Sequence, residues 1–268
     1  MSTTVPNPQS IPGTNASAVS RRWRGITSTG FSRVLGVATL VLVVWLVLFG
    51  LLFSPPDQTQ QSSVRIMYIH VPTAWVAYLA FGVTGLSSAM YLFRRAHSLA
   101  WDRVAGASAE IGVMFMALTL ITGSLWGRLT WGVYWAWDAR LTTTAFLFVT
   151  YVGYLAVRRL GGSHQARAKR SAVLGLLAVI EIPLVHFSVE LWRSLHQEAS
   201  VANPSGDVKM DGLMLFSLFV GLIAFSLLYF WLVLHRQRAM YLEDQYDDAD
   251  LDVALVERRA ETKEHSRA

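Results

Sequence analysis

Hydrophobic and polar positions follow one another in long blocks along this chain. Six segments of about twenty residues carry apolar side chains with few or no charges; they cover residues 34–53, 66–93, 104–127, 141–157, 171–189 and 212–234. A helix needs about twenty apolar residues to cross the roughly 30 Å hydrocarbon core of a bilayer. Backbone polar groups in lipid must be satisfied within the segment, which selects helices. The pattern predicts an all-α, polytopic membrane protein with six transmembrane helices.

The polar segments divide the chain into three parts. Residues 1–30 contain Pro, Ser, Thr and a cluster of arginines but no apolar core of a signal peptide, so we expect a polar N-terminal extension. Residues 31–240 form the predicted six-helix membrane domain, with an outer loop at 126–140. Residues 241–268 mix acidic and basic side chains and predict a solvated cytoplasmic tail, with partner docking as the alternative.

The distribution of Lys and Arg predicts how the chain is oriented. Fourteen of these residues lie in segments on one side, before the first span, between spans two and three, between spans four and five, and directly after the last span. Five lie on the other side, namely Arg65, Arg128, Arg140, Arg193 and Lys209. Cytoplasmic loops carry the excess of positive charge, so both termini are expected in the cytoplasm.

Composition narrows the class of protein. Charged residues make up 15% of the chain and hydrophobic residues 53%, whereas soluble domains carry about 25% charged residues. These values exclude a disordered chain and argue against a soluble enzyme. The net charge of +5 comes from residues that flank the spans, so we expect contact with membrane lipid and not with nucleic acid. The lack of cysteine excludes disulfides, thiolate catalysis and thioether-bound haem.

The segment between the third and fourth spans is rich in tryptophan. Trp126, Trp131, Trp135 and Trp137 fall within twelve residues, and Tyr134 adds a fifth aromatic ring. Tryptophans often line the membrane interface, but such a belt is normally spread over many helix ends. Flat rings interleaved with glycine also suit a flat apolar ligand. Composition alone leaves both interpretations open, an interfacial belt and a binding platform.

Charged residues flank this cluster at Arg128, Asp138 and Arg140. Asp138 could pair with Arg140 and fix the loop. Alternatively, an arginine could bind a ligand carboxylate through a two-pronged hydrogen bond. The two roles can belong to different arginines.

Two of the seven histidines lie within spans near the outer surface. His70 begins the second span, and His186 lies about 22 Å along the fifth span from its cytoplasmic end. An ionisable residue inside a membrane is a candidate functional residue. Two facing neutral imidazoles can occupy both axial positions of a haem iron. The alternative is that each imidazole hydrogen-bonds a neighbouring helix.

Three further residues surround this part of the chain. Pro183 removes a backbone hydrogen bond and predicts a kink in the fifth span just before His186. Glu181 lies near mid-membrane, and the sequence identifies no partner for it. His196 lies in the third outer loop, where contact with a ligand, contact with a partner and stabilisation of the loop are all open.

Residues 122–142 read TGSLWGRLTWGVYWAWDARLT and resemble the tryptophan-rich WWD signature of haem-handling membrane proteins in cytochrome c biogenesis. Within that group the chain is most similar to the CcmC family of the cytochrome c maturation system. Three stretches add to the similarity, RIMYIHVP at 65–72, PLVHFSVE at 183–190 and LHQ at 195–197. The resemblance covers about residues 35–240. Two departures are Tyr134, where many members have Trp, and Glu181, where a neutral residue is expected.

The resemblance implies a role for individual residues. It implies that His70 and His186 are axial ligands of haem b, held without a covalent bond. It implies that the loop from Trp126 to Asp138 holds the porphyrin at the outer, periplasmic face of a bacterial inner membrane. We expect a haem propionate to meet Arg128, Arg140 or Arg193. The implied partners are the haem chaperone CcmE and the subunits CcmA, CcmB and CcmD.

Other functions remain as alternatives. The chain has no phosphate-binding Gly-Lys-Ser/Thr loop, so ATP hydrolysis is expected in another subunit. Whether the chain itself promotes covalent attachment of haem to CcmE stays open. One alternative is a haem-independent assembly subunit of an ABC-type transporter. Another is a redox or quinone subunit whose haem only passes electrons.

Overall fold

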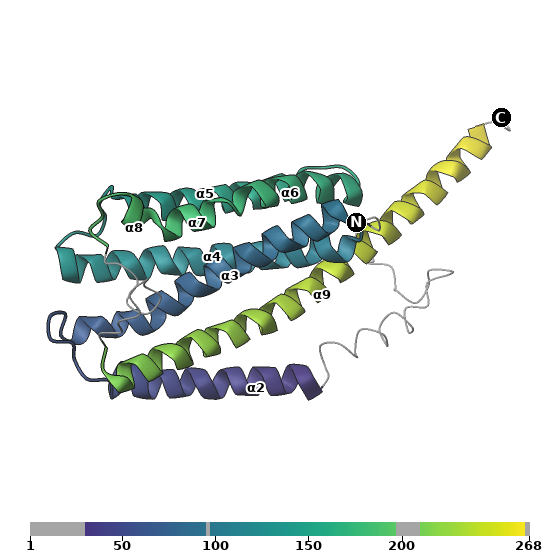
Figure 1. Ribbon diagram of the computed structural model, residues 1–268. Coiled ribbons are helices and arrows are strands. Elements are labelled where there is room, and N and C mark those ends of the chain that lie inside the picture. The colour runs from purple at the N-terminus through teal and green to yellow at the C-terminus, as the bar shows by residue number, and fades with distance from the viewer. Residues whose placement is uncertain (1–29, 95–96, 197–209, 266–268) are drawn as a thin grey trace, which may run out of the picture.

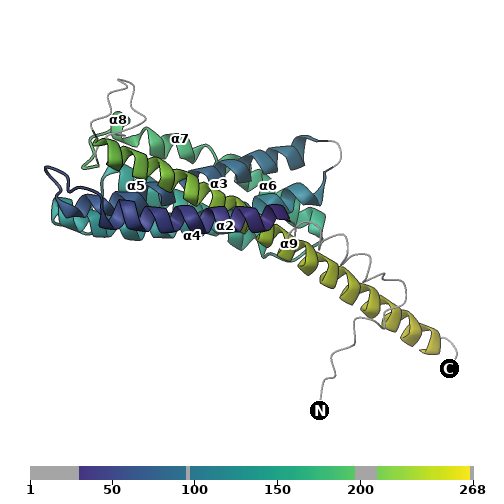
Figure 2. The same ribbon diagram turned by 90° about the horizontal axis from the view of Figure 1, so that it is seen from below.

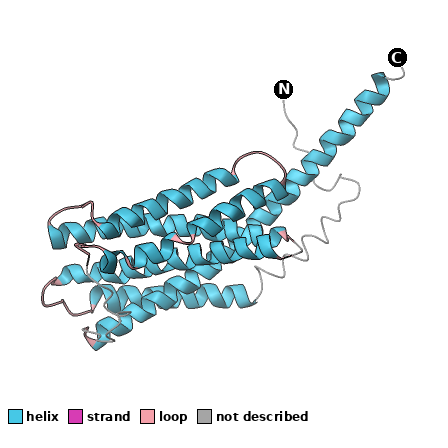
Figure 3. Ribbon diagram, turned by 45° about the horizontal axis from the view of Figure 1, so that its top comes forward, coloured by secondary structure: helices cyan, strands magenta, loops and turns pink. Residues whose placement is uncertain are grey.

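The computed structural model describes residues 30–94, 97–196 and 210–265, and these residues form helices joined by short connections (Figure 3). The arginine cluster of the N-terminal extension and most of the third outer loop lie outside the described residues. The helices are α2 (Gly30–Trp45) with a π-helical continuation (Leu46–Leu52), a 3-10 turn (Ser62–Ile66), α3 (Met67–Phe93), α4 (Leu99–Trp131), α5 (Ala139–Arg158), α6 (His164–Ala178), α7 (Glu181–His186), α8 (Ser188–Leu191) and α9 (Gly212–His265).

Five helical segments within the described residues are long and apolar enough to cross a membrane. They are Gly30–Leu52, Ser62–Phe93, Leu99–Trp131, Ala139–Arg158 and Gly212–Arg259. These segments coincide with the predicted spans one to four and six. The chain is therefore an all-α, polytopic membrane protein, as its hydrophobic pattern predicts.

The predicted fifth span is not one continuous helix. It is divided into α6, α7 and α8, which follow one another alongside α5 (Figure 1). Pro183 has no N–H to donate to the Val179 carbonyl, and the regular helix is interrupted at 179–180. The Ile182 N–H donates to that carbonyl instead, at 3.2 Å. The expected kink is thus a break ahead of Pro183, and a sixth membrane crossing stays a prediction.

The helices pack in layers, with α3 and α4 between the α5–α8 layer and the pair α2 and α9 (Figure 1). Small residues let the central helices approach closely, as is usual in membranes. A Cβ atom on Gly112 of α4 would lie only 2.5 Å from Cε1 of Phe81 on α3. Hydroxyl groups also join helices: Ser108 Oγ of α4 lies 2.7 Å from Tyr229 OH of α9.

One end of the bundle is held by ion pairs between distant parts of the sequence. Asp102 is buried and accepts from Arg158 Nη2 at 3.0 Å. Arg167 lies between Asp102 and Asp244, at 3.5 and 3.0 Å. Asp244 also accepts from Arg103 at 3.2 Å. These four contacts tie α4, α5, α6 and α9 together, and we call them the ionic network.

The predicted charged tail begins inside α9, without a break at residue 241. α9 has 54 residues, or about 80 Å at 1.5 Å per residue, and its C-terminal part extends beyond the bundle (Figure 2). The first turn of the tail is docked, because Asp244 belongs to the ionic network. The start of α2 and this part of α9 lie at the same end of the bundle (Figure 1). Their cytoplasmic location stays a prediction.

Candidate functional site

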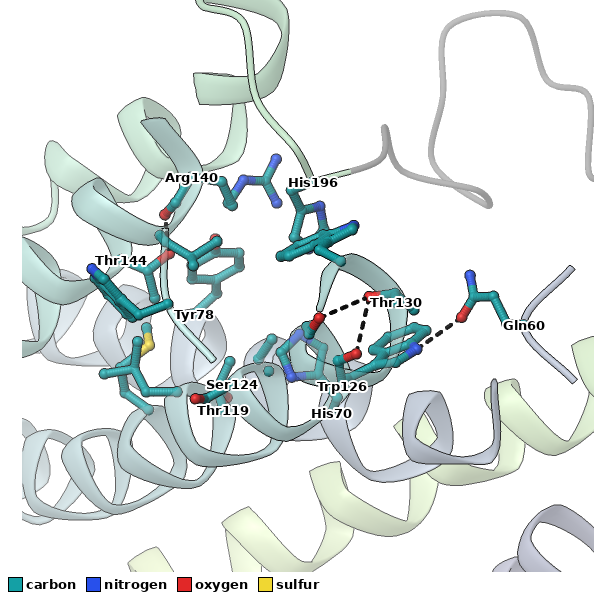
Figure 4. A pocket seen from close by; sticks show the side chains of 18 residues that line it. Gln60, His70, Tyr78, Thr119, Ser124, Trp126, Thr130, Arg140, Thr144 and His196 are labelled. Atoms are coloured by element: carbon teal, nitrogen blue, oxygen red, sulfur yellow. Dashed lines mark hydrogen bonds between the residues drawn. The ribbon is translucent and has the colours of Figure 1, made fainter. Parts of the chain in front are cut away.

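A cavity opens at the end of the bundle where α4 ends and α5 begins, opposite the ionic network. Its empty volume is about 910 Å³, a value that includes the open solvent at its mouth. Its walls come from α3, α4 and α5, the loop after α4 and the segment after α8. The lining residues that carry chemistry are His70, Trp126, Trp131, Trp135, Arg140 and His196. Figure 4 shows Tyr78, Arg140 and His196 on one side of this space and His70 and Trp126 on another.

The His70 ring is held by residues of α4. Its Nδ1 atom lies 3.1 Å from Thr122 Oγ1. The edge of the ring meets Trp126, with centroids 5.7 Å apart. At Gly123 the backbone passes so close that a Cβ atom would lie 2.8 Å from Cε1 of His70. The absence of a side chain at Gly123 therefore makes room for the imidazole.

Trp126 is anchored by the loop between the first two spans. Its indole Nε1 donates to Gln60 Oε1 at 2.8 Å. Gln60 is placed by a turn in which Asp57 Oδ1 accepts from the N–H groups of Gln60 and Thr59, both at 2.8 Å. These hydrogen bonds, of which the one from Gln60 has the largest effect, hold the pKa of Asp57 below its usual value. Neither residue is identifiable from the sequence, because nothing in the Asp57–Gln60 segment signals contact with α4.

The tryptophan-rich loop is divided between the cavity and its outer surface. α4 ends at Gly132, whose φ of 79° favours glycine, and the chain turns back there. Trp131 and Trp135 line the cavity. Trp137 packs edge to face on Trp135 but is 83% exposed, and Tyr134 is 58% exposed.

Arg128 belongs to this outer surface. Its guanidinium donates to the Gly132 carbonyl and lies 5.6 Å from the centre of the Tyr134 ring. These contacts stabilise the end of α4, so Arg128 is separated from the cavity lining. Of the residues predicted to contact the cofactor through ring or charge, Trp126, Trp131, Trp135 and Arg140 line the cavity, and Arg128, Tyr134, Trp137 and Asp138 lie outside its lining.

Asp138 joins two chain segments. Its Oδ1 accepts from Leu141 N at 2.8 Å and caps the N-terminus of α5. Its Oδ2 accepts from Ser194 Oγ at 2.7 Å and from Leu195 N at 2.9 Å. Burial acts to raise the pKa of Asp138, but these hydrogen bonds outweigh burial and the pKa is lowered. The carboxylate therefore holds the segment that carries His196 and is not paired with Arg140.

Arg140 connects α5 to the broken fifth span. Its Nη2 donates to the His186 carbonyl at 2.8 Å, and its Nε donates to Ser188 Oγ at 3.1 Å. It also lines the cavity. Two N–H groups of the guanidinium are thus used for packing, and its remaining donors are the cationic part of the cavity wall.

The two histidines predicted as a pair have different surroundings. His70 lines the cavity, whereas His186 is outside its lining. The His186 ring packs edge to face on Phe187 at 5.0 Å and on Tyr78 at 6.5 Å. His196 does line the cavity, and its ring lies 6.3 Å from the Trp131 ring. The imidazoles that share the cavity are those of His70 and His196.

The chain matches a known protein family over most of its length. The family CcmC, described as Heme exporter protein C, matches residues 16–251. The chain belongs to the CcmC family. Three relatives bear the same name, Heme exporter protein C. That of Bradyrhizobium diazoefficiens is 43% identical over 76% of each chain. That of Haemophilus influenzae is 38% identical over 77% of this chain and 82% of its own, and that of Escherichia coli K12 is 33% identical over 78% and 82%.

The description of the CcmC family names haem, and the lining of the cavity suits a ligand of that shape and charge. Aromatic walls suit a flat apolar ring, and Arg140 suits an anionic group at its edge. The Trp135 indole Nε1 is buried and has no acceptor within the described residues, so a ligand oxygen could accept from it. The described residues contain no cluster of three or more His, Asp or Glu that could hold a metal. A haem iron needs only one or two protein ligands.

Glu181 has a partner in the structure. Thr150 Oγ1 of α5 donates to Glu181 Oε1 at 2.9 Å. The sequence leaves this residue without an explanation, because Thr150 lies 31 positions earlier and only the packing of α5 against α7 brings the two together. The contact is one of the side-chain hydrogen bonds that hold the broken fifth span against its neighbour in this CcmC-family chain.

Proposed function

We propose that this chain holds haem b without a covalent bond at the periplasmic face of a bacterial inner membrane and delivers it to the haem chaperone CcmE. The observation that supports this most is one cavity that combines two imidazoles, three indoles and a guanidinium. Each group matches one part of haem, namely the iron, the porphyrin ring and a propionate. Membership of the CcmC family supports the same role.

We assign His70 and His196 as the iron ligands. Both line the cavity, and they come from α3 and from the segment after α8, so they can approach a flat ligand from different elements. His186 is retained as the alternative second ligand. Its carbonyl accepts from Arg140, and its ring packs on Tyr78, so it supports the cavity wall in the present geometry.

Arg140 is the proposed propionate contact. It lines the cavity, whereas Arg128 is engaged by Gly132 and Tyr134 on the outer surface. Haem would be bound by packing and by two exchangeable imidazole ligands, which suits a protein that gives its ligand away. The proposed partners CcmA, CcmB and CcmD would supply ATP hydrolysis, for which this chain has no phosphate-binding motif.

Transfer can be tested with the purified components. The full chain is purified in detergent with adequate haem supply, and its visible spectrum is recorded before and after addition of the CcmE periplasmic domain. The expected result is a haem spectrum that moves from the membrane protein to CcmE. Arg140→Gln should weaken haem binding, and Arg128→Gln, a matched change outside the cavity, should not.

Two results would contradict the proposal. A chain that purifies without haem but still binds its partner subunits would favour an assembly subunit. A haem that is reduced by a quinol and stays on the chain in the presence of CcmE would favour a redox subunit.

A further inference from the structure

We propose that Thr122 of α4 fixes the tautomer of His70, so that the His70 Nε2 lone pair is free to bind iron in the cavity. Thr122 would be a positioning residue that acts through His70. The inference rests on the proposed function, because it concerns the histidine that we assign to haem. Thr122 is the first residue of the tryptophan-rich segment at 122–142, but it does not line the cavity.

The Thr122 hydroxyl lies between acceptors on its own helix and the His70 ring. A threonine hydroxyl has one hydrogen to donate and lone pairs with which to accept. The Thr122 hydroxyl donates along its own helix, to the Leu118 carbonyl at 2.7 Å, with the Thr119 carbonyl at 3.3 Å as the other acceptor. Both of these partners are carbonyls and can only accept. The hydrogen of Thr122 is therefore already used within α4.

The remaining side of Thr122 Oγ1 faces His70. The two atoms in contact are Thr122 Oγ1 and His70 Nδ1, at 3.1 Å. With the hydroxyl hydrogen directed to the Leu118 carbonyl, we assign Thr122 Oγ1 as the acceptor and His70 Nδ1 as the protonated ring nitrogen. A neutral imidazole with its proton on Nδ1 has its lone pair on Nε2 and binds a metal through that atom. An outer hydrogen bond of this kind fixes the tautomer and the orientation of a ligating histidine.

The lack of a side chain at Gly123 leaves room for the His70 ring. A Cβ atom at this position would be 2.8 Å from His70 Cε1, 3.4 Å from Nδ1 and 3.7 Å from Nε2. The Cε1 edge of the imidazole is thus the part nearest to Gly123, and Thr122 reaches Nδ1 beside it. Trp126, one turn further along α4, meets the ring edge to face at 5.7 Å. Thr122, Gly123 and Trp126 together leave the imidazole little freedom to turn.

The test uses two variants of the full-length protein. Thr122→Val keeps the shape of the side chain and removes the acceptor, whereas Thr122→Ser keeps the hydroxyl. Changes in such outer partners typically cost 10- to 100-fold in metal affinity. We expect haem to bind about 10-fold more weakly to Thr122→Val, with a shifted Soret band and altered electron paramagnetic resonance signals. Thr122→Ser should restore both.

Thr39→Val is the matched control. Thr39 Oγ1 also donates along its own helix, to Leu35 O at 2.8 Å, but it lies in α2, outside the cavity lining. This variant should bind haem as the wild type does. If Thr122→Val matches the wild type in affinity and spectrum while His70→Ala loses haem, the tautomer inference is wrong and the proposed function stands. If His70→Ala itself keeps wild-type haem, both are wrong.

A second measurement reports the tautomer of His70 directly, in the protein without haem. Nitrogen-15 resonances of labelled histidine report which ring nitrogen carries the proton. In the haem-free wild-type protein, His70 should carry its proton on Nδ1, with His70→Ala used to assign the resonance. A proton on Nε2 would overturn the inference without any reference to haem binding.

Discussion

At the scale of single residues, the site depends on an absent side chain and an unpaired N–H group as well as on the side chains that line it. Gly123 has no side chain where His70 needs room, and Trp135 has an indole N–H without an acceptor among the described residues. Thr122 and Gln60 use one hydrogen bond each to hold a neighbouring aromatic ring. The rings of the cavity wall are thus oriented by neighbouring residues, of which Gln60 and Gly123 also line the cavity and Thr122 does not.

Gly123→Ala should disturb the site and leave the fold intact. The added methyl group would lie 2.8 Å from His70 Cε1, so the imidazole must turn away from α4. We expect weaker haem binding and a changed spectrum, with a melting temperature near that of the wild type. Visible titration with haem and thermal unfolding in detergent measure the two effects.

The control for this change is Gly82→Ala on α3. A Cβ atom there meets nothing within 4 Å, so the variant should bind haem normally. Alanine in place of glycine in a helix stabilises by about 0.5–1 kcal/mol, which sets the expected direction of any change in stability. Equal haem binding by both glycine variants would contradict the role assigned to Gly123.

At the scale of elements, Asp138 connects the tryptophan-rich loop to the segment that holds His196. One oxygen caps α5, and the other accepts from Ser194 and Leu195. Asp138→Asn keeps a good cap, since asparagine can accept from Leu141 N. It replaces the second acceptor by an NH₂ group, so the His196 segment loses both hydrogen bonds. We expect a loss of about 1–3 kcal/mol in stability at neutral pH and weaker haem binding.

The pH dependence of this clamp has a definite sign. The pKa of Asp138 is lowered in the folded chain, so the carboxylate stabilises the fold above its unfolded pKa of about 3.9. That contribution is lost as the pH falls through the lower, folded pKa. The stability difference between the wild type and Asp138→Asn should therefore be full near pH 6 and shrink below about pH 4. A difference that stays constant across this range would contradict the assignment.

The sequence predicts the helices well where the length of an apolar segment determines them. It predicts them less well where a local break or packing between distant residues determines their continuity. Five of the six expected spans are long apolar helices, because about twenty uncharged residues have few other stable forms in lipid. The fifth is divided, since Pro183 has no N–H to continue the helix and the regular pattern is interrupted at 179–180.

The same limit applies to the site. His70, Trp126, Trp131, Trp135 and Arg140 are found from residue type and position alone, and they line one cavity. Whether His186 or His196 shares that cavity depends on the tether to Asp138, which joins residues 56 and 57 positions apart. Hydrophobic pattern and spacing carry no information on such a contact.

At the scale of the whole molecule, the cavity and the ionic network occupy opposite ends of the bundle. Asp102 is buried against Arg158, and removal of one partner from a buried ion pair costs about 3–5 kcal/mol. Asp102→Asn should lower the melting temperature clearly and leave the haem spectrum unchanged. Thermal unfolding and visible spectroscopy on the same sample measure both.

Glu257→Gln provides the comparison for this prediction. Glu257 is exposed on the part of α9 that extends beyond the bundle, so its replacement should change neither stability nor spectrum. A spectrum altered by Asp102→Asn would show that the two ends are coupled, and wild-type stability in that variant would contradict the role given to the ionic network.

We propose that His70 and His196 face the same haem. The most direct measurement is the visible and electron paramagnetic resonance spectrum of haem in the wild type and in His70→Ala, His196→Ala and His186→Ala. We predict loss or alteration of the haem signal in the first two variants and a signal close to wild type in His186→Ala. A normal signal in His196→Ala together with a lost signal in His186→Ala would show that His186, and not His196, is the second iron ligand.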